Sequence, residues 1–491
     1  MIHRRTALKA VAAAGAFAAF SGSVPGLRAF AAQAPRVRRS VNTMALDDPD
    51  LSTYRDFVGL MRARSASRRV SWVGFCNQHG SATEFLNCPH GDWYFLPWHR
   101  AFQQMYENAA MVLMRNPRFA MPYWDWTALR DMPAAFTDKT YKGKPNPLYV
   151  PGLGDDASKA RNALTGDNAL TDEKVGPQLM QGIYAETDYE AFGTSRNPEQ
   201  TDTDGKWVPA GGGVQGPLEA SAHNSVHGSI GGYMPGTNSP RDPVFFMHHG
   251  NIDRIWARWH ALGRQDSTDP LWLGMAFSNH FVSPQGRLYT RVVKDLLSIE
   301  ALGYTYDDMP RPETQVVDPE RLGNLAALFQ PARKSQAPRA RVANSAAALP
   351  TAPLSLAVPM AKSAVEPAVA PVTEGKAARE VVALIRDIRL GDGVRAVRVF
   401  VNLDSVSADV PETDPHFVAR LAFLRHGSGA HSAHKALPSA LVNLTAALRK
   451  LAATEGLASD RITIQLVPVP EPGAAASTVE AVPGSIEIAV I

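Results

Sequence analysis

The sequence predicts a mainly α-helical domain with long loops, followed by a β-rich, sandwich-like domain. A chain of 491 residues is long enough for more than one domain. Helical periodicity is clear in three segments of the first two thirds, at residues 51–66, 100–116 and 242–263. From residue 378 onward the pattern changes to short, β-branched runs with partial alternation. The change in pattern therefore indicates two domains of different class.

The first 31 residues have the features of an export signal. Arg4 and Arg5 precede a modestly apolar, alanine-rich stretch, and Ala-Phe-Ala at 29–31 supplies small residues for cleavage. We interpret residues 1–31 as a twin-arginine signal, in preference to an ordinary N-terminal helix with a basic start. The mature chain would then begin near Ala32, in the periplasm or outside the cell.

Composition excludes several classes of function. The formal net charge of +3 is too small for a nucleic-acid-binding surface, and the body of the chain has no basic cluster. After the N-terminus, no apolar run is long enough to span a membrane. Two cysteines cannot form a disulfide framework, so the fold does not depend on covalent cross-links.

The domain boundaries follow from local composition. The helical domain is expected at 32–330, and its third periodic segment starts with Asp242 as N-cap and Pro243 as first helical residue. Residues 331–377 are rich in Ala, Pro, Ser and Val, which predicts a linker that a protease can reach. Residues 378–491 combine several strand-like runs with one amphipathic helix, which predicts the β-rich domain.

Six of the fourteen histidines form two groups of three. The spacings are H-x10-H-x8-H and H-x3-H-x21-H, and the residues are His79, His90 and His99, then His223, His227 and His249. On a helix, His223 and His227 lie one turn apart, so both rings can reach one metal ion. A single histidine in an apolar helix is usually a core residue, and an H-x3-H pair alone is a weak signal. Two triples, each beside an aromatic-rich helix, favour two metal sites.

The ligand type narrows the choice of metal. Ligation by imidazole alone suits copper, zinc, iron or nickel, and the order of affinities favours copper where it is available. Zinc would use one triple as a complete catalytic site, which leaves the second triple unexplained.

Two segments resemble the copper-binding motifs of tyrosinases and polyphenol oxidases, the type-3 copper family. The first is CPHGDWYFLPWHR at 88–100, followed by Glu107, and the second spans 223–256 and contains the Asp-Pro-x-Phe of residues 242–245. The resemblance continues into the C-terminal block at 399–424 and 462–470, which are similar to the C-terminal domain of bacterial tyrosinases. It covers nearly all of the chain that follows the export signal.

The resemblance implies a fold, a cofactor and a reaction. It implies a four-helix bundle that holds two copper ions, with His79, His90 and His99 on the first and His223, His227 and His249 on the second. His248 matches an adjacent position that does not bind metal, and Phe245 matches an aromatic residue that packs on the ligand rings. The implied reaction is ortho-hydroxylation of monophenols with O2 and oxidation of o-diphenols to o-quinones, which feed melanin-type pigments or phenol metabolism.

Two further residues match a proton-handling pattern of the family. Glu219 precedes His223 by four residues and Asn224 follows it, which resembles the E-x3-H-N pattern that holds a water beside the second copper. That water can take the proton of a phenol. The alternatives are a charge that favours a helix start for Glu219 and a solvent-facing polar residue for Asn224. Gly228, directly after His227, suggests open access for phenols.

Cys88 lies two residues before His90, the spacing at which some type-3 copper proteins join a cysteine to the histidine ring as a thioether. We favour this thioether over a Cys76–Cys88 disulfide or a free thiol, because the cross-link would fix the ring and protect the thiol.

The resemblance also suggests that the C-terminal domain covers the copper site and keeps the enzyme latent until it is removed. Within the enzyme class, the alternative is a catechol oxidase that acts on o-diphenols only. A haemocyanin-like O2 carrier and a zinc hydrolase are more distant alternatives.

Overall fold

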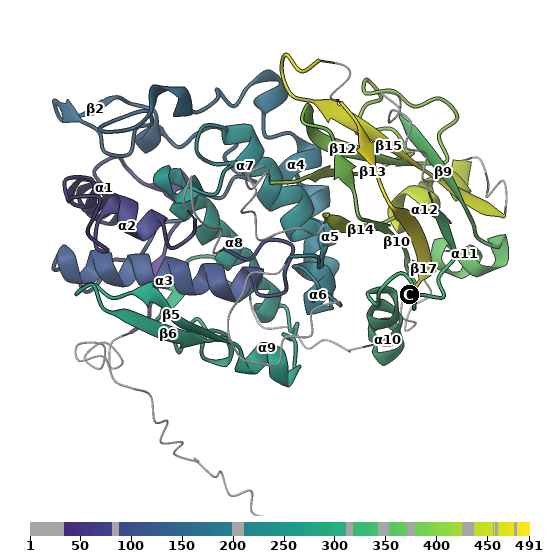
Figure 1. Ribbon diagram of the computed structural model, residues 1–491, viewed down its shortest axis with the longest axis horizontal. Coiled ribbons are helices and arrows are strands. Elements are labelled where there is room, and N and C mark those ends of the chain that lie inside the picture. The colour runs from purple at the N-terminus through teal and green to yellow at the C-terminus, as the bar shows by residue number, and fades with distance from the viewer. Residues whose placement is uncertain are drawn as a thin grey trace, which may run out of the picture.

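The computed structural model describes residues 34–80, 88–198, 211–310, 318–341, 353–370, 379–424, 437–454, 456, 460–475 and 479–491. The predicted export signal lies outside the described residues. Within them, a helical domain packs beside a β-rich domain, as the sequence predicts (Figure 1). None of the described helices combines the length and the apolar character that crossing a membrane requires.

The helical domain is built around two long helices. Its helices are α1 (Pro49–Arg62), α2 (Trp72–Cys76), α3 (Phe95–Leu113), α4 (Asp172–Val175), α5 (Pro177–Ala185), α6 (Tyr189–Phe192), the π-helical segment η5 (Leu218–His223), α7 (Asn224–Ile230), α8 (Val244–Ala261), α9 (Pro270–Gly274) and α10 (Pro319–Leu328). Short 3-10 turns lie between them, at Val41–Thr43, Ala134–Phe136, Ala157–Lys159, Gly166–Asn168, Ser239–Arg241 and Val293–Asp295. Helices α3 and α8 pack against each other and form the centre of one large core that is rich in aromatic residues.

The helical domain also contains small two-stranded sheets. They are the parallel pair β1 (Arg36–Arg38) and β7 (Tyr304–Tyr306) and the hairpins β2 (Thr140–Tyr141) with β3 (Lys144–Pro145) and β5 (Ala276–Val282) with β6 (Leu288–Val292). Arg38 of β1 is fully buried, and its guanidinium pairs with Glu107 of α3 and Asp253 of α8. Arg100, the residue after His99 on α3, also pairs with Asp253. This buried network ties α3 to α8, because both buried carboxylates are paired with arginine.

Helix α8 starts one residue later than the sequence predicts, with Pro243 as N-cap and Val244 as first helical residue. The Asp242 carboxylate accepts the backbone N–H of Val244 at 2.9 Å, which satisfies a donor that the first turn leaves unpaired. Asp242 also pairs with Arg161, and the arginine links the helix start to the loop before α4.

The described part of the C-terminal domain consists of two larger sheets, the two-stranded sheet β11–β16 and two helices. Its strands are β8 (Arg339–Arg341), β9 (Leu354–Pro359), β10 (Val381–Arg386), β11 (Arg389–Leu390), β12 (Val394–Val401), β13 (Phe417–Ala422), β14 (Ser439–Asn443), β15 (Arg461–Pro470), β16 (Ala481–Val482) and β17 (Ser485–Val490), and its helices are α11 (Lys362–Val369) and α12 (Thr445–Thr454). One of the larger sheets has the order β4-β14-β10-β17-β8 and the other has the order β13-β12-β15-β9. Apolar residues of both sheets and both helices share one core, which confirms the sandwich-like domain.

The first of these sheets crosses the domain boundary. Its edge strand β4 (Val214–Gln215) belongs to the helical domain and pairs in parallel with β14, with Gln215 opposite Ala440. Strand β10 is buried on both faces: Val381 and Ala383 point into the sandwich core, whereas Val382 and Leu384 pack with Val214 and α10. This two-sided burial explains why β10 is an unbroken apolar run rather than an alternating one.

The segment 331–377 differs from the linker that the sequence predicts. Its described part contains β8, β9 and α11, with β8 paired to β17 and β9 paired to β15 along six residues. Val358, Val365 and Ala368 lie in the sandwich core. Alanine- and proline-rich composition does not reveal these elements, because their strand pairing is with residues more than 100 positions later.

Candidate dinuclear metal site

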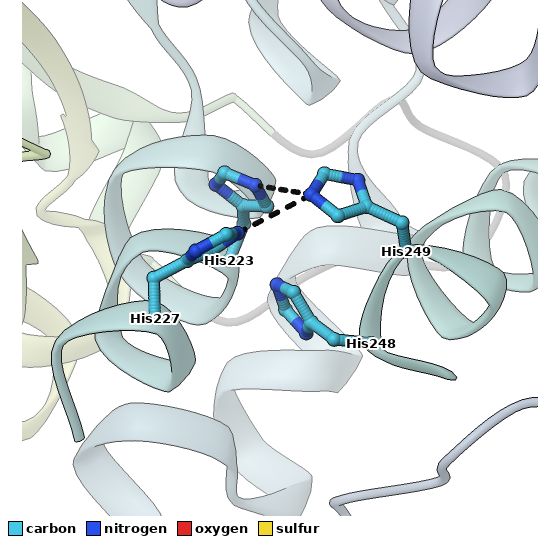
Figure 2. A group of neighbouring side chains, drawn as sticks. All are labelled: His223, His227, His248 and His249. Carbon is cyan, nitrogen blue, oxygen red and sulfur yellow. Dashed lines mark hydrogen bonds between the residues drawn. The ribbon is translucent and has the colours of Figure 1, made fainter. Parts of the chain in front are cut away.

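The second histidine group lies on two helical segments. His223 ends η5, His227 lies one turn later on α7, and His249 comes from α8 (Figure 2). The Nε2 atom of His249 lies 3.4 Å from Nε2 of His223 and 3.2 Å from Nε2 of His227. All three side chains are buried. The spacing in the sequence therefore brings three ring nitrogens to one point.

Hydrogen bonds fix which ring nitrogen carries the proton. Nδ1 of His223 lies 2.8 Å from the side-chain oxygen of Asn224, and Nδ1 of His227 lies 2.7 Å from the carbonyl of Met234. Because these oxygens only accept, each Nδ1 is the donor and each Nε2 keeps its lone pair. The lone pairs of His223 and His227 therefore both point at the Nε2 of His249. A proton on that nitrogen could form a hydrogen bond with only one of them. A metal cation would satisfy all three nitrogens, so the residues fit a bound metal.

His248 has the opposite arrangement. It lies beside the three rings, and its Nδ1 accepts the indole N–H of Trp126 at 3.2 Å. The proton of His248 is therefore on Nε2, for which the described residues provide no hydrogen-bond partner. This favours His249 over His248 as the ligand, in agreement with the expectation from the motif.

The first group is assembled from a loop and a helix. His79 follows α2, His90 precedes α3 and His99 lies on α3, and the three ring centroids are 5.3–5.8 Å apart. Nδ1 of His79 lies 2.8 Å from the carbonyl of Thr237, and Nδ1 of His99 lies 2.7 Å from that of Phe95. Both rings therefore also keep Nε2 as a lone pair.

The two groups face each other. The rings of His99 and His249 stack with centroids 4.3 Å apart, and those of His90 and His223 are 5.4 Å apart. Phe245 packs against rings of both groups, 5.2 Å from His79 and 4.1 Å from His249. The arrangement is suited to a dinuclear centre.

Burial favours the neutral form of His79 and of the three histidines of the second group. It lowers the pKa of His79 to about 3 and that of His227 to about 4. It also lowers the pKa of His223 and His249 well below the ordinary value, and the nearby imidazoles lower both further. Neutral imidazole is the form that binds a metal ion.

Cys88 is buried against His90, with Sγ 3.2 Å from Nδ1 of the ring. No disulfide joins Cys76 and Cys88, so the structure does not contain the alternative of a Cys76–Cys88 disulfide. Burial raises the pKa of the Cys88 thiol well above its ordinary value, which makes it a poor ligand unless it is deprotonated. The thioether to His90 stays a prediction.

Glu219 is buried beside the first group. Its Oε1 accepts the backbone N–H of Gly91 at 2.9 Å, and its Oε2 accepts a hydrogen bond from the hydroxyl of Thr194. Burial raises the pKa of Glu219 to about 8. A carboxyl group with this pKa is close to the range in which a proton is exchanged at neutral pH.

Asn224 is held from three sides. Its oxygen accepts from His223, and its amide nitrogen donates to Gln215 Oε1 at 3.1 Å and to the carbonyl of Ala422 at 2.8 Å. Ala422 ends β13 of the C-terminal domain, so the two domains meet at this residue. Glu173 of α4 adds ion pairs to Arg398 and Arg420 of the same domain.

Sequence reasoning missed Thr194, Gln215 and the turn at Gly91. The run Gly-Gly-Gly-Val-Gln-Gly at 211–216 was the available signal. A Cβ on Gly213 would lie 2.1 Å from the carbonyl of Ser195, so only glycine permits this close approach.

Comparison with known proteins agrees with this site. The family model described as the common central domain of tyrosinase matches residues 53–262, and that of the chloroplastic polyphenol oxidase C-terminal domain matches residues 352–487. The second range includes β9 and α11, which places these elements of the predicted linker in the C-terminal domain.

Three curated relatives are similar along parts of their length. The chain is 30% identical to polyphenol oxidase A1 of Vicia faba over 56% of this chain and 48% of that protein. It is 28% identical to polyphenol oxidase E of Solanum lycopersicum over 81% and 66%, and 27% identical to a tyrosinase of Hahella sp. over 54% and 62%. The match thus spans about half to two thirds of these relatives. Since two of the three are chloroplastic plant proteins, the similarity is not specific to bacterial tyrosinases.

Solved structures share the two-domain fold. Latent aurone synthase, a polyphenol oxidase, has a TM-score of 0.63 at 23% identity, with 94% of this chain and 90% of that chain covered. Latent apple tyrosinase has a TM-score of 0.60 at 24% identity, with 93% and 97% covered. The sequence matches, the shared fold and the two histidine triples agree, and the chain belongs to the tyrosinase and polyphenol oxidase family with its C-terminal domain.

Proposed function

We propose that this protein is a tyrosinase that hydroxylates monophenols at the ortho position with O2 and oxidises o-diphenols to o-quinones. The observation that carries the proposal is the pair of buried histidine triples whose rings face each other. Copper would be held by His79, His90 and His99 on one side and by His223, His227 and His249 on the other. A bound copper pair supplies the O2 chemistry, and the protein supplies geometry and proton handling.

Glu219 is the proposed proton acceptor. A phenol has a pKa near 10, like that of tyrosine, so hydroxylation benefits from a group that takes the phenol proton. The raised pKa of Glu219, about 8, is closer to the pKa of a phenol than the pKa of an ordinary glutamate is. Thr194 and Gly91 hold the two carboxylate oxygens in place.

Asn224 is proposed to orient His223 and to help hold a water beside Glu219. Both of its N–H groups are used by Gln215 and Ala422, so it cannot donate to that water. Its oxygen accepts from His223 and keeps a second lone pair, which can accept from a water. The water would therefore donate to Asn224 and to Glu219, which leaves its own lone pairs free to take a proton.

The C-terminal domain is proposed to keep the enzyme latent. Strand β13 packs against η5 and α7, the segments that carry His223 and His227. A cut between β8 and β9 would not release the domain by itself, because β4–β14 and β8–β17 pairing and the Glu173 ion pairs remain. Activation would thus require displacement as well as cleavage.

We also propose that residues 1–31 direct export by the twin-arginine route and that the thioether joins Cys88 to His90. Export is tested by replacing Arg4 and Arg5 with lysine and locating the protein in cell fractions of a bacterial host. Retention of the variant in the cytoplasm, with wild type exported, is expected.

The activity is tested with copper-loaded protein, intact and after limited proteolysis, with tyrosine or a simple monophenol and with catechol. The appearance of quinone absorbance from both substrates, with a larger rate after proteolysis, is expected. Oxidation of catechol without any product from monophenols would identify a catechol oxidase instead. Reversible O2 binding without turnover would identify a carrier.

A further inference from the structure

We propose that Gln215 is a positioning residue for the second metal site, and that the C-terminal domain acts on the same side chain, Asn224, that Gln215 holds. The proposal deepens the function proposed above and rests on it for the reaction, but its main test needs no turnover.

The first step is the orientation of Asn224. An amide side chain can rotate by half a turn and exchange its oxygen and nitrogen. Only the orientation with the oxygen toward His223 accepts the Nδ1 proton and leaves Nε2 free for a metal. On the other side, the carbonyl of Ala422 selects that orientation because a carbonyl can only accept, and Gln215 Oε1 accepts from the same nitrogen of Asn224.

The second step is the position of Gln215 between the two histidine groups. Its Oε1 accepts from Asn224, the residue after His223. Its Nε2 lies close to Gly91, the residue after His90, because a Cβ added to this glycine would be 3.5 Å from that nitrogen. The side chain is 7% exposed. Gln215 therefore contacts the neighbour of a ligand in one group and lies against the neighbour of a ligand in the other.

The third step is the link to the C-terminal domain. Gln215 lies on β4, which pairs with β14 of that domain, and Ala422 ends its strand β13. The domain thus fixes both acceptors of the Asn224 amide. It holds the backbone of Gln215 through the pairing of β4 with β14, and it supplies the carbonyl of Ala422 itself. Displacement of the domain would remove the Ala422 acceptor and leave Gln215 as the remaining one, so activation changes the support of His223 as well as access to the site.

The test compares three variants of the full chain. Gln215→Met keeps the volume and removes the acceptor, and Gln215→Glu keeps an acceptor oxygen. Val214→Ala is the control on the same strand, because the apolar side chain of Val214 packs against β10 and α10. Copper affinity is measured by competition with a chelator. The unfolding temperature of each metal-free protein reports general damage, and the rates with a monophenol and with catechol are compared.

We expect Gln215→Met to bind copper on the order of 10-fold more weakly, the lower end of the range for groups that orient metal-ligating histidines. Gln215→Glu should retain affinity close to wild type, as should Val214→Ala. Wild-type affinity in Gln215→Met, or an equal loss in Val214→Ala, would overturn the proposal. A protein that binds copper as expected but turns over no phenol would refute the proposed function and leave the role of Gln215 supported.

Discussion

The two histidine groups provide the same kind of ligand but are held in different ways. His223 and His227 lie on consecutive helical turns, and His249 lies on the long helix α8. In the first group only His99 lies on a long helix, whereas His79 and His90 lie in the connection between α2 and α3. The first group has Cys88 against one of its rings, and the second has Asn224. Helical geometry thus positions most of one site, whereas side-chain contacts must position more of the other.

A second difference concerns the C-terminal domain. Among the described residues, a hydrogen bond from that domain reaches the neighbour of a ligand only in the second group, where Ala422 accepts from Asn224. The second group is therefore the one whose geometry depends on the presence of the domain. The predictions below test the separate character of the two groups, from the largest expected effect to the smallest.

Replacing His249 with alanine should remove the second metal and abolish phenol oxidation. Loss of a ligand is expected to exceed the roughly 10–100-fold cost of losing a group that only orients a ligand. Metal analysis should give one copper per chain. His248→Ala is the matched control, because its Nδ1 accepts from Trp126 and does not face a metal. Two coppers per chain are expected for this control, and the reverse pattern would exchange the two assignments.

Glu219→Gln should separate the two reactions. Removal of a proton acceptor costs roughly 10²–10⁴-fold for the step that needs it, so hydroxylation of monophenols should fall by that amount. Oxidation of catechol should fall less, since its hydroxyl protons are lost more easily once the substrate is bound. Initial rates with both substrates measure the difference. An equal loss for both would assign Glu219 to support of the site rather than to proton transfer.

Cys88→Ala tests the contact that supports the first group. If the thioether forms, the intact wild-type protein is lighter by two hydrogen atoms, and a reducing agent does not restore that mass. The variant should then lose roughly 10-fold in copper affinity at the first site, because the His90 ring is no longer fixed. Cys76→Ala, which removes a buried thiol without contact to a ligand in the described residues, serves as the control. An unmodified mass with two titratable thiols would exclude the cross-link.

The sequence patterns located the second histidine group better than they located the start of the C-terminal domain. The H-x3-H spacing and Asp242 are local signals, so the second group and the start of α8 could be placed from the sequence. Gln215 and Thr194 could not, because their contacts depend on how a glycine-rich strand folds against Gly91 and Glu219. The strands of segment 331–377 were also missed, since a strand at the edge of a sheet is defined by partners far along the chain.

The smallest expected effect concerns Lys174, which lies between the second group and the C-terminal domain. Its Nζ donates to Ser229, on the same helix as His227, and to the carbonyl oxygens of Asp167 and Ala169. Burial, followed by the nearby Arg420, lowers the pKa of Lys174 from 10.5 to about 7. The unfolded chain therefore keeps a proton between about pH 7 and 10.5 that the folded protein has released.

Stability from this group should rise with pH through that window, because the unfolded state binds more protons there, and should not change with pH below it. Lys174→Met should flatten this slope in urea unfolding at pH 7, 8 and 9. Lys294→Met, at an exposed position, controls for the loss of one positive charge. If the slope survives in Lys174→Met, the lysine is not the group that titrates. If the slope is lost only in Lys174→Met, the titration of Lys174 makes stability depend on pH at the contact between α4, the helix α7 of the second group and strand β13 of the C-terminal domain.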